Sequence, residues 1–387
     1  MKTLITILGS TGSIGLSVLS ILEKKKNLFK INILLANKNL KLICYQIRRY
    51  KPKIYVVQDI QTYHKIKKKF SKNKTRIVNS LAEVSQIKKS DLTVSAIPGV
   101  AGLQPTLFMI KKSKKILIAN KESIICGWKI LNNESKKFNT KIIPIDSEHY
   151  SIFNLLKGHK IDDVKRVYLT ASGGPFLNYK SKQLKNISPK EALRHPKWKM
   201  GKKISIDSST LMNKMLEVIE AQRLFSIPEN KIDILIHPDS LVHAIIQFKN
   251  GLTKFLYHET SMKIPISNAI FNGKLDIKDF YKFKINENKI VNNLKFMKVD
   301  KNTFPIIKIK HRINELPSTP IIINACNEIL VDQFLQKKIK FSSISKIIMS
   351  ILNDKNYTKY AIRSPKNVNQ IIKIDNWARM VTLNKIK

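Results

Sequence analysis

The 387-residue chain has few cysteines and no long apolar run, and each shortage excludes a class of protein. Its three cysteines, Cys44, Cys126 and Cys326, are far apart and fit neither a zinc pattern nor a disulfide framework, so a reducing cytoplasm is expected. No stretch approaches the ~20 apolar residues of a membrane span. The N-terminal apolar stretch is interrupted by glycines after Leu8 and lacks a cleavage site, which indicates folded structure and not a secretory signal.

Acidic residues are also scarce, because 27 Asp and Glu face 71 Lys and Arg and give a formal net charge of +44. A charge of this size ordinarily suggests a nucleic-acid or membrane partner. The basic residues nevertheless extend from end to end, in runs such as 67–69, without an RNA-binding motif or a basic stripe interleaved with aromatics. An accompanying excess of Ile and Asn is typical of compositional drift in an AT-rich genome. We therefore expect no nucleic acid and no membrane as partners.

The first 146 residues alternate short apolar runs with helical stretches. Continuous apolar runs are typical of strands in a parallel sheet that is covered on both faces. The expected strands are 4–8, 31–36, 54–57, 92–97, 116–119 and 142–145. The pattern predicts an α/β fold that opens with a Rossmann-like, doubly wound parallel sheet over residues 1–146.

The sequence pattern changes twice along the rest of the chain. The length and the 43% hydrophobic content of the whole chain suit two or three domains. Residues 147–272 read as a central α+β catalytic domain, which contains a segment bounded by Pro and Gly at 195–201. Residues 273–301 are rich in Lys and Asn and are expected to form a linker. Residues 302–387 read as a C-terminal helical domain.

A glycine-rich segment, Gly9–Gly15 (GSTGSIG), follows the first expected strand and precedes an apolar helical stretch. Glycines allow a tight turn and close approach to a pyrophosphate, while free N–H groups at the helix start face the anion. The spacing G-x-x-G-x-x-G differs from the commoner G-x-G-x-x-G, so a glycine-rich turn without a ligand stays an alternative. The expected second strand ends in Ala36-Asn37-Lys38-Asn39 without the acid that binds ribose hydroxyls, which favours NADP over NAD.

Acidic residues at three positions predict a metal site. Asp146 and Glu148 follow an expected strand, and residues two apart point to one side of an extended chain. Glu217 is a third acid on a helix expected to begin near Ser208. Oxygen ligands suit Mg²⁺ or Mn²⁺ better than zinc. The alternative is a pair of solvated or salt-bridged acids.

The same helix start is a candidate phosphate site. Asn213 and Glu217 are i,i+4 neighbours, and Lys214 lies beside them. Ser208, Asn213 and Lys214 are therefore expected to hold a phosphate near the helix N-terminus. A capped amphipathic helix with a surface ion pair is the alternative, but it gives no reason for Asn213.

The segment 195–201 (HPKWKMG) is expected to be irregular, and its Trp and Met suggest a lid that closes over a ligand. The alternative is a Trp that anchors a static loop to the core.

Together and in this order, these motifs resemble the 1-deoxy-D-xylulose 5-phosphate reductoisomerase family of the non-mevalonate isoprenoid pathway, over essentially the whole chain. The matching segments are 9–15, 120–123 (NKES), 146–149 (DSEH), 172–176 (SGGPF), 195–201, 207–217, 237–240 (HPDS) and 324–328 (NACNE).

The resemblance implies metal-assisted rearrangement and NADPH-dependent reduction of 1-deoxy-D-xylulose 5-phosphate to 2-C-methyl-D-erythritol 4-phosphate. It implies cofactor contacts at Thr11, Gly12, Ser13, Ile14, Asn37, Lys38, Asn39, Asn120, Glu122 and Gly201. It implies substrate contacts at Lys121, Ser147, Glu148, Ser172, His195, Ser208, Asn213, Lys214 and Glu217, with Lys121, Glu148 and His195 catalytic. Asp146, Glu148 and Glu217 would bind Mg²⁺ or Mn²⁺, with Co²⁺ a further candidate. A homodimer is implied by the resemblance alone.

Two positions depart from the usual family pattern, and two other classes of protein stay open. Asn37 stands where Gly is common, which Asn tolerates better than other residues, and Asp239 stands where Gln is common. One rival is another NADP-dependent oxidoreductase, which would need no metal-binding acids. The other is a basic binding protein that has kept the scaffold and lost activity, although the retained acids together with Lys121 and His195 disfavour it.

Overall fold

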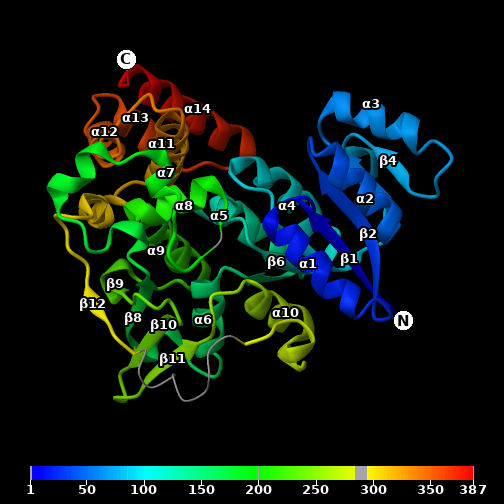
Figure 1. The fold of residues 1–387 in the computed structure, drawn as a ribbon, viewed down its shortest axis with the longest axis horizontal. Coiled ribbons are helices and arrows are strands. Elements are labelled where there is room, and N and C mark those ends of the chain that lie inside the picture. The colour runs from blue at the N-terminus through cyan, green and yellow to red at the C-terminus, as the bar shows by residue number, and fades with distance from the viewer. Residues whose placement is uncertain (1, 85, 199, 284–293, 387) are drawn as a thin grey trace. The chain divides into compact units, whose positions relative to one another are not determined.

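The computed structural model describes residues 2–84, 86–198, 200–283 and 294–386, and the chain forms two compact units (Figure 1). The first unit contains Met1–Ser123, Lys129–Asp146 and Met262–Phe283. The second contains Ile124–Trp128, Ser147–Ser261 and Lys284–Lys387. Residues 284–293 of the predicted linker and Lys199 of the predicted lid lie outside the described residues. The four-part domain division stays a prediction.

The first unit is built on a parallel sheet of seven strands in the order β4-β3-β2-β1-β5-β6-β7. The strands are β1 Thr3–Leu8, β2 Phe29–Ala36, β3 Ile54–Val57, β4 Arg76–Val78, β5 Ser90–Ser95, β6 Ser113–Ile118 and β7 Lys141–Pro144. The helices are α1 Ser13–Lys24, α2 Leu40–Tyr50, α3 Ile60–Lys69, α4 Leu103–Ile110, α5 Lys121–Lys137 and α10 Lys263–Phe271. The predicted α/β fold with a doubly wound parallel sheet is confirmed.

The strands β2 to β4 lie on one side of β1, and β5 to β7 lie on the other. The order in which strands are added therefore reverses between β1 and β5, and both strands pair with their neighbours in parallel. In open α/β sheets, ligands bind beyond the carboxyl ends of the strands at this reversal point. The turn after β1 is therefore at the expected ligand-binding edge. The edge strand β4 was not predicted, because it spans three residues and begins with the exposed Arg76.

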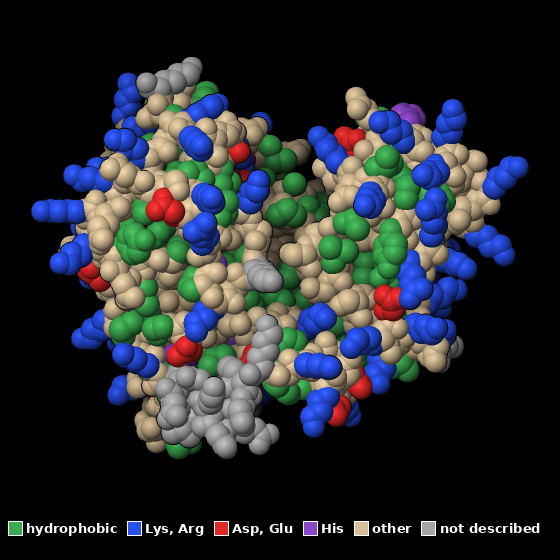
Figure 2. All heavy atoms as spheres, in the orientation of Figure 1, with side chains coloured by type: hydrophobic (Ala, Val, Ile, Leu, Met, Phe, Trp, Pro, Cys, Tyr) green, Lys and Arg blue, Asp and Glu red, His purple; other side chains and the backbone are tan. Residues whose placement is uncertain are grey.

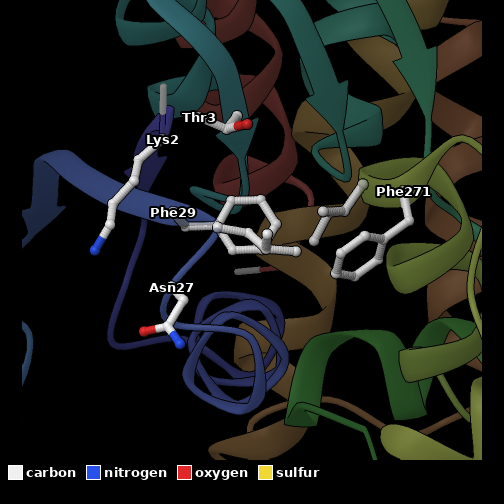
Figure 3. A pocket seen from close by; sticks show the side chains of 7 residues that line it. Lys2, Thr3, Asn27, Phe29 and Phe271 are labelled. Atoms are coloured by element: carbon white, nitrogen blue, oxygen red, sulfur yellow. The ribbon is translucent and has the colours of Figure 1, made fainter.

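The segment that contains α10 returns to the first unit from later in the chain. Phe271 packs edge-on against Phe29 with ring centroids 5.6 Å apart, and Lys115 Nζ donates to the Ala269 carbonyl at 3.0 Å. Figure 3 shows these two rings at a surface pocket of about 490 Å³ whose rim includes Lys2 and Asn27. Aromatic contacts thus fix α10 to the start of β2.

The second unit contains a five-stranded sheet in the order β11-β10-β8-β9-β12. Its strands are β8 Val164–Ala171, β9 Ile232–Ile236, β10 Val242–Phe248, β11 Thr253–Tyr257 and β12 Met297–Lys298. The helices are α6 Ser147–Leu155, α7 Pro189–Ala192, α8 Lys202–Thr210, α9 Met212–Phe225, α11 Thr319–Leu335, α12 Ser343–Leu352, α13 Tyr357–Ala361 and α14 Val368–Asn384. The mainly helical C-terminal region was expected. β12 shows that the predicted linker also contributes a short strand.

The single helix expected to begin near Ser208 is instead two helices. Leu211 adopts the left-handed conformation (φ 61°, ψ 11°), which ends α8 at Thr210 and lets α9 begin at Met212. Ser208 therefore lies in the last turn of α8, and its carbonyl accepts from Leu211 N at 3.1 Å. The prediction of Ser208 as an N-terminal residue of this helix was wrong.

Basic side chains are spread across the face drawn in Figure 2 and do not gather into one stripe among the described residues there. In the parts of the chain that the structure describes, no helix combines the length and the apolar character that crossing a bilayer requires.

The turn after β1 depends on glycine, which gives a testable prediction. A Cβ added to Gly15 would lie 2.4 Å from the Gly9 carbonyl oxygen, so the backbone would have to move. We expect Gly15→Ala to lower the free energy of unfolding by about 2 kcal/mol or more. Gly201→Ala is the control, because a Cβ there meets nothing within 4 Å and the backbone φ is −66°. Urea unfolding monitored by circular dichroism measures both, and equal midpoints would contradict the packing argument.

Candidate functional site

The turn between β1 and α1 has the features of a phosphate-binding loop. Gly12 is the N-cap of α1, and among the described residues no side chain bonds to this helix start. Gly9 has a positive φ of 84°, and its N–H and that of Ser10 both donate to the Leu35 carbonyl at 2.9 Å. The backbone N–H groups of the first turn are thus available to an anion, as a dinucleotide pyrophosphate requires. Of the predicted contacts, Thr11 and Gly12 lie in this turn, and Ser13 and Ile14 are the first two residues of α1.

Residues 37–39 follow β2 directly and are all exposed. Asn39 is committed to the fold, because its side chain caps α2 by accepting from Leu42 N at 3.1 Å. Asn120 likewise caps α5 by accepting from Ser123 N at 2.7 Å, and it lies next to the buried Glu122. Gly201, the remaining predicted cofactor contact, is the N-cap of α8 in the second unit.

The three predicted metal ligands come together. Asp146, Glu148 and Glu217 each offer a carboxylate oxygen, and these oxygens all lie within 4.8 Å of one another. Glu148 is in the first turn of α6, and Glu217 is a buried residue of α9. The extended geometry predicted for residues 146–149 was wrong, because α6 already begins at Ser147. Oxygen donors in this number suit Mg²⁺ or Mn²⁺.

Two lysines balance these carboxylates. Lys214 Nζ lies 2.6 Å from Glu217 Oε2 and also contacts the Glu148 carboxylate, while Lys121 Nζ lies 3.4 Å from Asp146 Oδ2. Burial opposes the charge of Lys214, but the charges of Glu148 and Glu217 outweigh it and raise its pKa. Asn213 donates to the same Glu217 carboxylate. Lys214 is therefore a cation that the acids hold in place.

His195 and Ser172, both predicted substrate contacts, form a hydrogen bond of 3.0 Å between Nε2 and Oγ. The other ring nitrogen, Nδ1, accepts from the backbone N–H groups of Lys197 at 3.1 Å and Trp198 at 2.9 Å. These two donors require Nδ1 to be unprotonated, so the neutral ring carries its proton on Nε2. Burial, assisted by the nearby Lys214 charge, lowers the pKa of His195 to about 4.

Ser172 and Ser208 belong to neighbouring segments. Ser172 Oγ also accepts from Gly174 N at 3.0 Å, and a Cβ on Gly174 would lie 3.1 Å from the Ser208 carbonyl oxygen. Because Ser172 Oγ accepts from two groups, its own proton is free for a ligand. The segment that carries Ser172 thus packs against the backbone of Ser208 in the second unit.

The described residues of the predicted lid are irregular, as expected. Lys197 Nζ lies 3.0 Å from Asp239 Oδ1, so the lid is linked by an ion pair to the segment after β9. This contact gives a physical reason for an acid at position 239. The pair is partly exposed, which limits its contribution to stability to about 1 kcal/mol or less.

The sequence did not reveal two sets of buried, interacting polar side chains on the elements that carry the predicted site residues. His149 Nε2 lies 3.0 Å from the Glu217 carbonyl, and its Nδ1 lies 3.2 Å from Glu220 Oε2. Asp207 accepts from Asn327 Nδ2 at 2.7 Å and pairs with Lys203 at 2.8 Å. The i,i+3 spacing of Glu217 and Glu220 was a signal for the first group. The second joins α8 to α11 across 120 residues, and no local pattern predicts it.

Three family models match the chain in sequence order. Residues 5–127 match "1-deoxy-D-xylulose 5-phosphate reductoisomerase". Residues 142–225 match the C-terminal domain of the same reductoisomerase, and residues 258–381 match "DXP reductoisomerase C-terminal domain".

Relatives and solved structures agree over nearly the whole length. The 1-deoxy-D-xylulose 5-phosphate reductoisomerase of Pelagibacter ubique is 42% identical over 97% of each chain, and that of Clostridium novyi is 38% identical over 98% of each. The Zymomonas mobilis reductoisomerase in complex with NADPH is 32% identical and superimposes with a TM-score of 0.90 over both whole chains. A reductoisomerase in complex with NADPH, fosmidomycin and magnesium has the same identity and TM-score, covering 99% of this chain and 98% of its own.

The lowered pKa of His195 predicts how stability depends on pH. Its native pKa of about 4 lies below the usual 6.5, so between these values the folded chain binds fewer protons than the unfolded chain. We therefore expect this histidine to make the free energy of unfolding decrease as pH falls from about 6.5 to about 4. His195→Gln should reduce that decrease. Urea unfolding at several pH values measures it, and identical pH dependence in both proteins would rule the effect out.

Proposed function

The chain belongs to the 1-deoxy-D-xylulose 5-phosphate reductoisomerase family, and from this premise we propose how its residues carry out the family's reaction. It is an NADPH-dependent enzyme that rearranges and reduces 1-deoxy-D-xylulose 5-phosphate to 2-C-methyl-D-erythritol 4-phosphate with a divalent metal ion. The observation that carries the residue assignments is the convergence of three carboxylates beside a buried lysine. An oxidoreductase without a metal would have no use for this cluster.

We propose that Asp146, Glu148 and Glu217 hold Mg²⁺ or Mn²⁺, with Co²⁺ as a further candidate. The ion would supply Lewis-acid polarisation of the substrate carbonyl. The fit is supported by the oxygen-only donor set and by the cation that already lies among the acids, Lys214. A metal ion that neutralises the carboxylates would leave the Lys214 ammonium available to the substrate phosphate.

Four polar side chains of the second unit are the proposed phosphate ligands: Ser172, Ser208, Asn213 and Lys214. Ser172 has a free hydroxyl proton, and Lys214 supplies the charge. Ser147, Glu148 and Glu217 would contact the rest of the substrate. A charged lysine buried among hydrogen-bonding groups recognises a phosphate more strongly than an exposed one does, because little water screens it.

Lys121, Glu148 and His195 are the proposed catalytic residues. Neutral His195 carries its proton on Nε2, because Nδ1 accepts from two backbone N–H groups, and a bound substrate would replace Ser172 Oγ as the acceptor of that proton. Lys121 is buried beside Asp146, which suits proton exchange with a bound substrate. The described lid segments at 195–198 and 200–201 would close over the substrate and exclude water.

NADPH would supply the hydride. We propose that Thr11, Gly12, Ser13 and Ile14 hold its pyrophosphate and that residues 37–39 hold its 2′-phosphate. Asn120, Glu122 and Gly201 would make further contacts. On this basis residues 1–146 form the cofactor domain, 147–272 the catalytic domain with the lid at 195–201, and 302–387 the helical domain that follows the 273–301 linker.

We further propose that the enzyme is a cytoplasmic homodimer. The three cysteines are free and buried, which suits a reducing compartment. The strand β11 pairs only with β10 among the described residues and carries the exposed Phe255, and the exposed Leu252 directly precedes the strand. An exposed apolar edge strand is a ready surface for pairing with a second copy.

Replacing one proposed metal ligand should separate metal binding from folding. We expect Glu217→Gln to lower kcat by about 10²- to 10³-fold, because a weakly held ion polarises the carbonyl poorly. Its Mn²⁺ affinity should fall at least about 100-fold. The assay follows NADPH oxidation at 340 nm with 1-deoxy-D-xylulose 5-phosphate, with and without Mn²⁺, and calorimetry measures metal binding.

The matched control for that experiment is Glu229→Gln, which alters a part-buried carboxylate that pairs with Lys310. It should keep both metal affinity and turnover. Metal-dependent turnover that persists in Glu217→Gln would refute the proposed ligand set. No NADPH consumption by the wild-type protein would refute the proposed activity.

The proposed dimer has a separate test. Phe255→Lys should shift the mass measured by light scattering from twice 44.6 kDa towards 44.6 kDa, because a charge on the edge strand opposes pairing. Leu28→Lys, at an exposed apolar residue of the first unit, is the control and should leave the mass unchanged. A monomeric wild-type protein would refute the dimer.

A further inference from the structure

Three buried polar side chains meet beneath the glycine-rich turn of the first unit. Ser10 Oγ lies 2.7 Å from Gln46 Oε1 and 3.1 Å from Tyr55 Oη, and Tyr55 Oη lies 2.7 Å from Gln46 Oε1. Gln46 Nε2 donates to the Ser10 carbonyl at 2.9 Å. All three residues have no solvent exposure. We call these residues the Ser10–Gln46–Tyr55 hub.

The hydrogen bonds of the hub constrain the orientation of its groups. The Ser10 carbonyl can only accept, so the Gln46 amide nitrogen must face it and the amide oxygen must face the two hydroxyls. Each hydroxyl lies 2.7 Å from Gln46 Oε1 and can donate to it, and either hydroxyl can donate to the other at 3.1 Å. Burial raises the pKa of the Tyr55 phenol, so this group remains a donor. The hub therefore fixes the orientation of the Gln46 amide.

The hub connects the two segments that the cofactor would span. Ser10 lies in the turn proposed to hold the pyrophosphate, and Gln46 lies on α2, which begins directly after the 37–39 segment proposed to hold the 2′-phosphate. Tyr55 extends from β3, the neighbour of β2 in the sheet. A buried amide and two hydroxyls give less net stability than apolar groups of the same shape could, so their benefit is a defined geometry.

We propose that Gln46 and Tyr55 are positioning residues for NADPH. They hold the glycine-rich turn at a fixed separation from the start of α2, so that one rigidly spaced ligand can contact both. Neither residue touches the cofactor in this role. The inference rests on the cofactor contacts assigned under the proposed function.

If the hub positions the two segments, its loss should weaken the binding of a ligand that contacts both segments. It should not weaken the binding of a fragment that contacts only one. Gln46→Leu should weaken NADPH binding about tenfold, and Tyr55→Phe about threefold, because buried hydrogen-bonding groups lose partners. Adenosine 2′-phosphate, which would engage only residues 37–39, should bind each variant within about twofold of wild type.

Calorimetric titration of the wild-type and variant proteins with NADPH and with adenosine 2′-phosphate tests this, and thermal unfolding reports whether each variant is folded. Tyr63→Phe is the matched control, since it removes the hydroxyl of another buried tyrosine of the same unit, to which Lys67 Nζ donates at 2.9 Å. It should leave both affinities unchanged. If Gln46→Leu does not fold, the milder Tyr55→Phe gives the test.

Equal losses of affinity for both ligands would overturn the proposal, because the hub would then only support folding. Unchanged NADPH affinity in the folded Tyr55→Phe protein would overturn it as well, while wild-type NADPH binding would leave the proposed function standing. A wild-type protein that does not bind NADPH would overturn the proposed function itself.

Discussion

The mutual repulsion of three carboxylates is the constraint on which the proposed catalytic site depends. Oxygens of Asp146, Glu148 and Glu217 lie within 4.8 Å of one another, and Glu217 is fully buried. Two like charges about 4 Å apart repel by about 1 kcal/mol in water and by about 4 kcal/mol where the effective dielectric constant is near 20. Cations beside the acids offset this repulsion. Lys214 and Lys121 do so in the described structure, which keeps the cluster ready for a divalent ion.

The break between α8 and α9 lies directly before two charged residues of this cluster. A left-handed, non-glycine residue costs about 1 kcal/mol or more, yet Leu211 adopts this conformation in a buried position. The break starts a new helix whose first turn carries Lys214 and whose second turn carries Glu217. Met212 N, at the start of α9, donates to Thr210 Oγ1 at 3.2 Å. Local strain is thus compensated by a hydrogen bond and by the placement of Lys214 against its two acids.

The sequence predicted those features that local rules encode. Six of the seven strands of the first sheet and the turn after β1 follow from apolar runs and glycine spacing, and the three acids follow from residue type. The helix break did not follow, because no Gly or Pro lies between 202 and 225 to mark it. The Ser10–Gln46–Tyr55 hub joins residues 36 and 45 positions apart, a contact that periodicity cannot reveal.

The chain's large positive charge differs in kind from the charge at the site. Surface lysines act on an anionic ligand over about 8 Å at physiological salt, and those in Figure 2 are spread over the drawn face. Such a distribution speeds the arrival of any anion and selects none. Lys214 is buried, oriented by two carboxylates and close to hydrogen-bond donors, so its charge is screened by little water. In the proposed site, selectivity for a phosphorylated substrate would therefore come from this buried ammonium and its partners, and not from the net charge of +44.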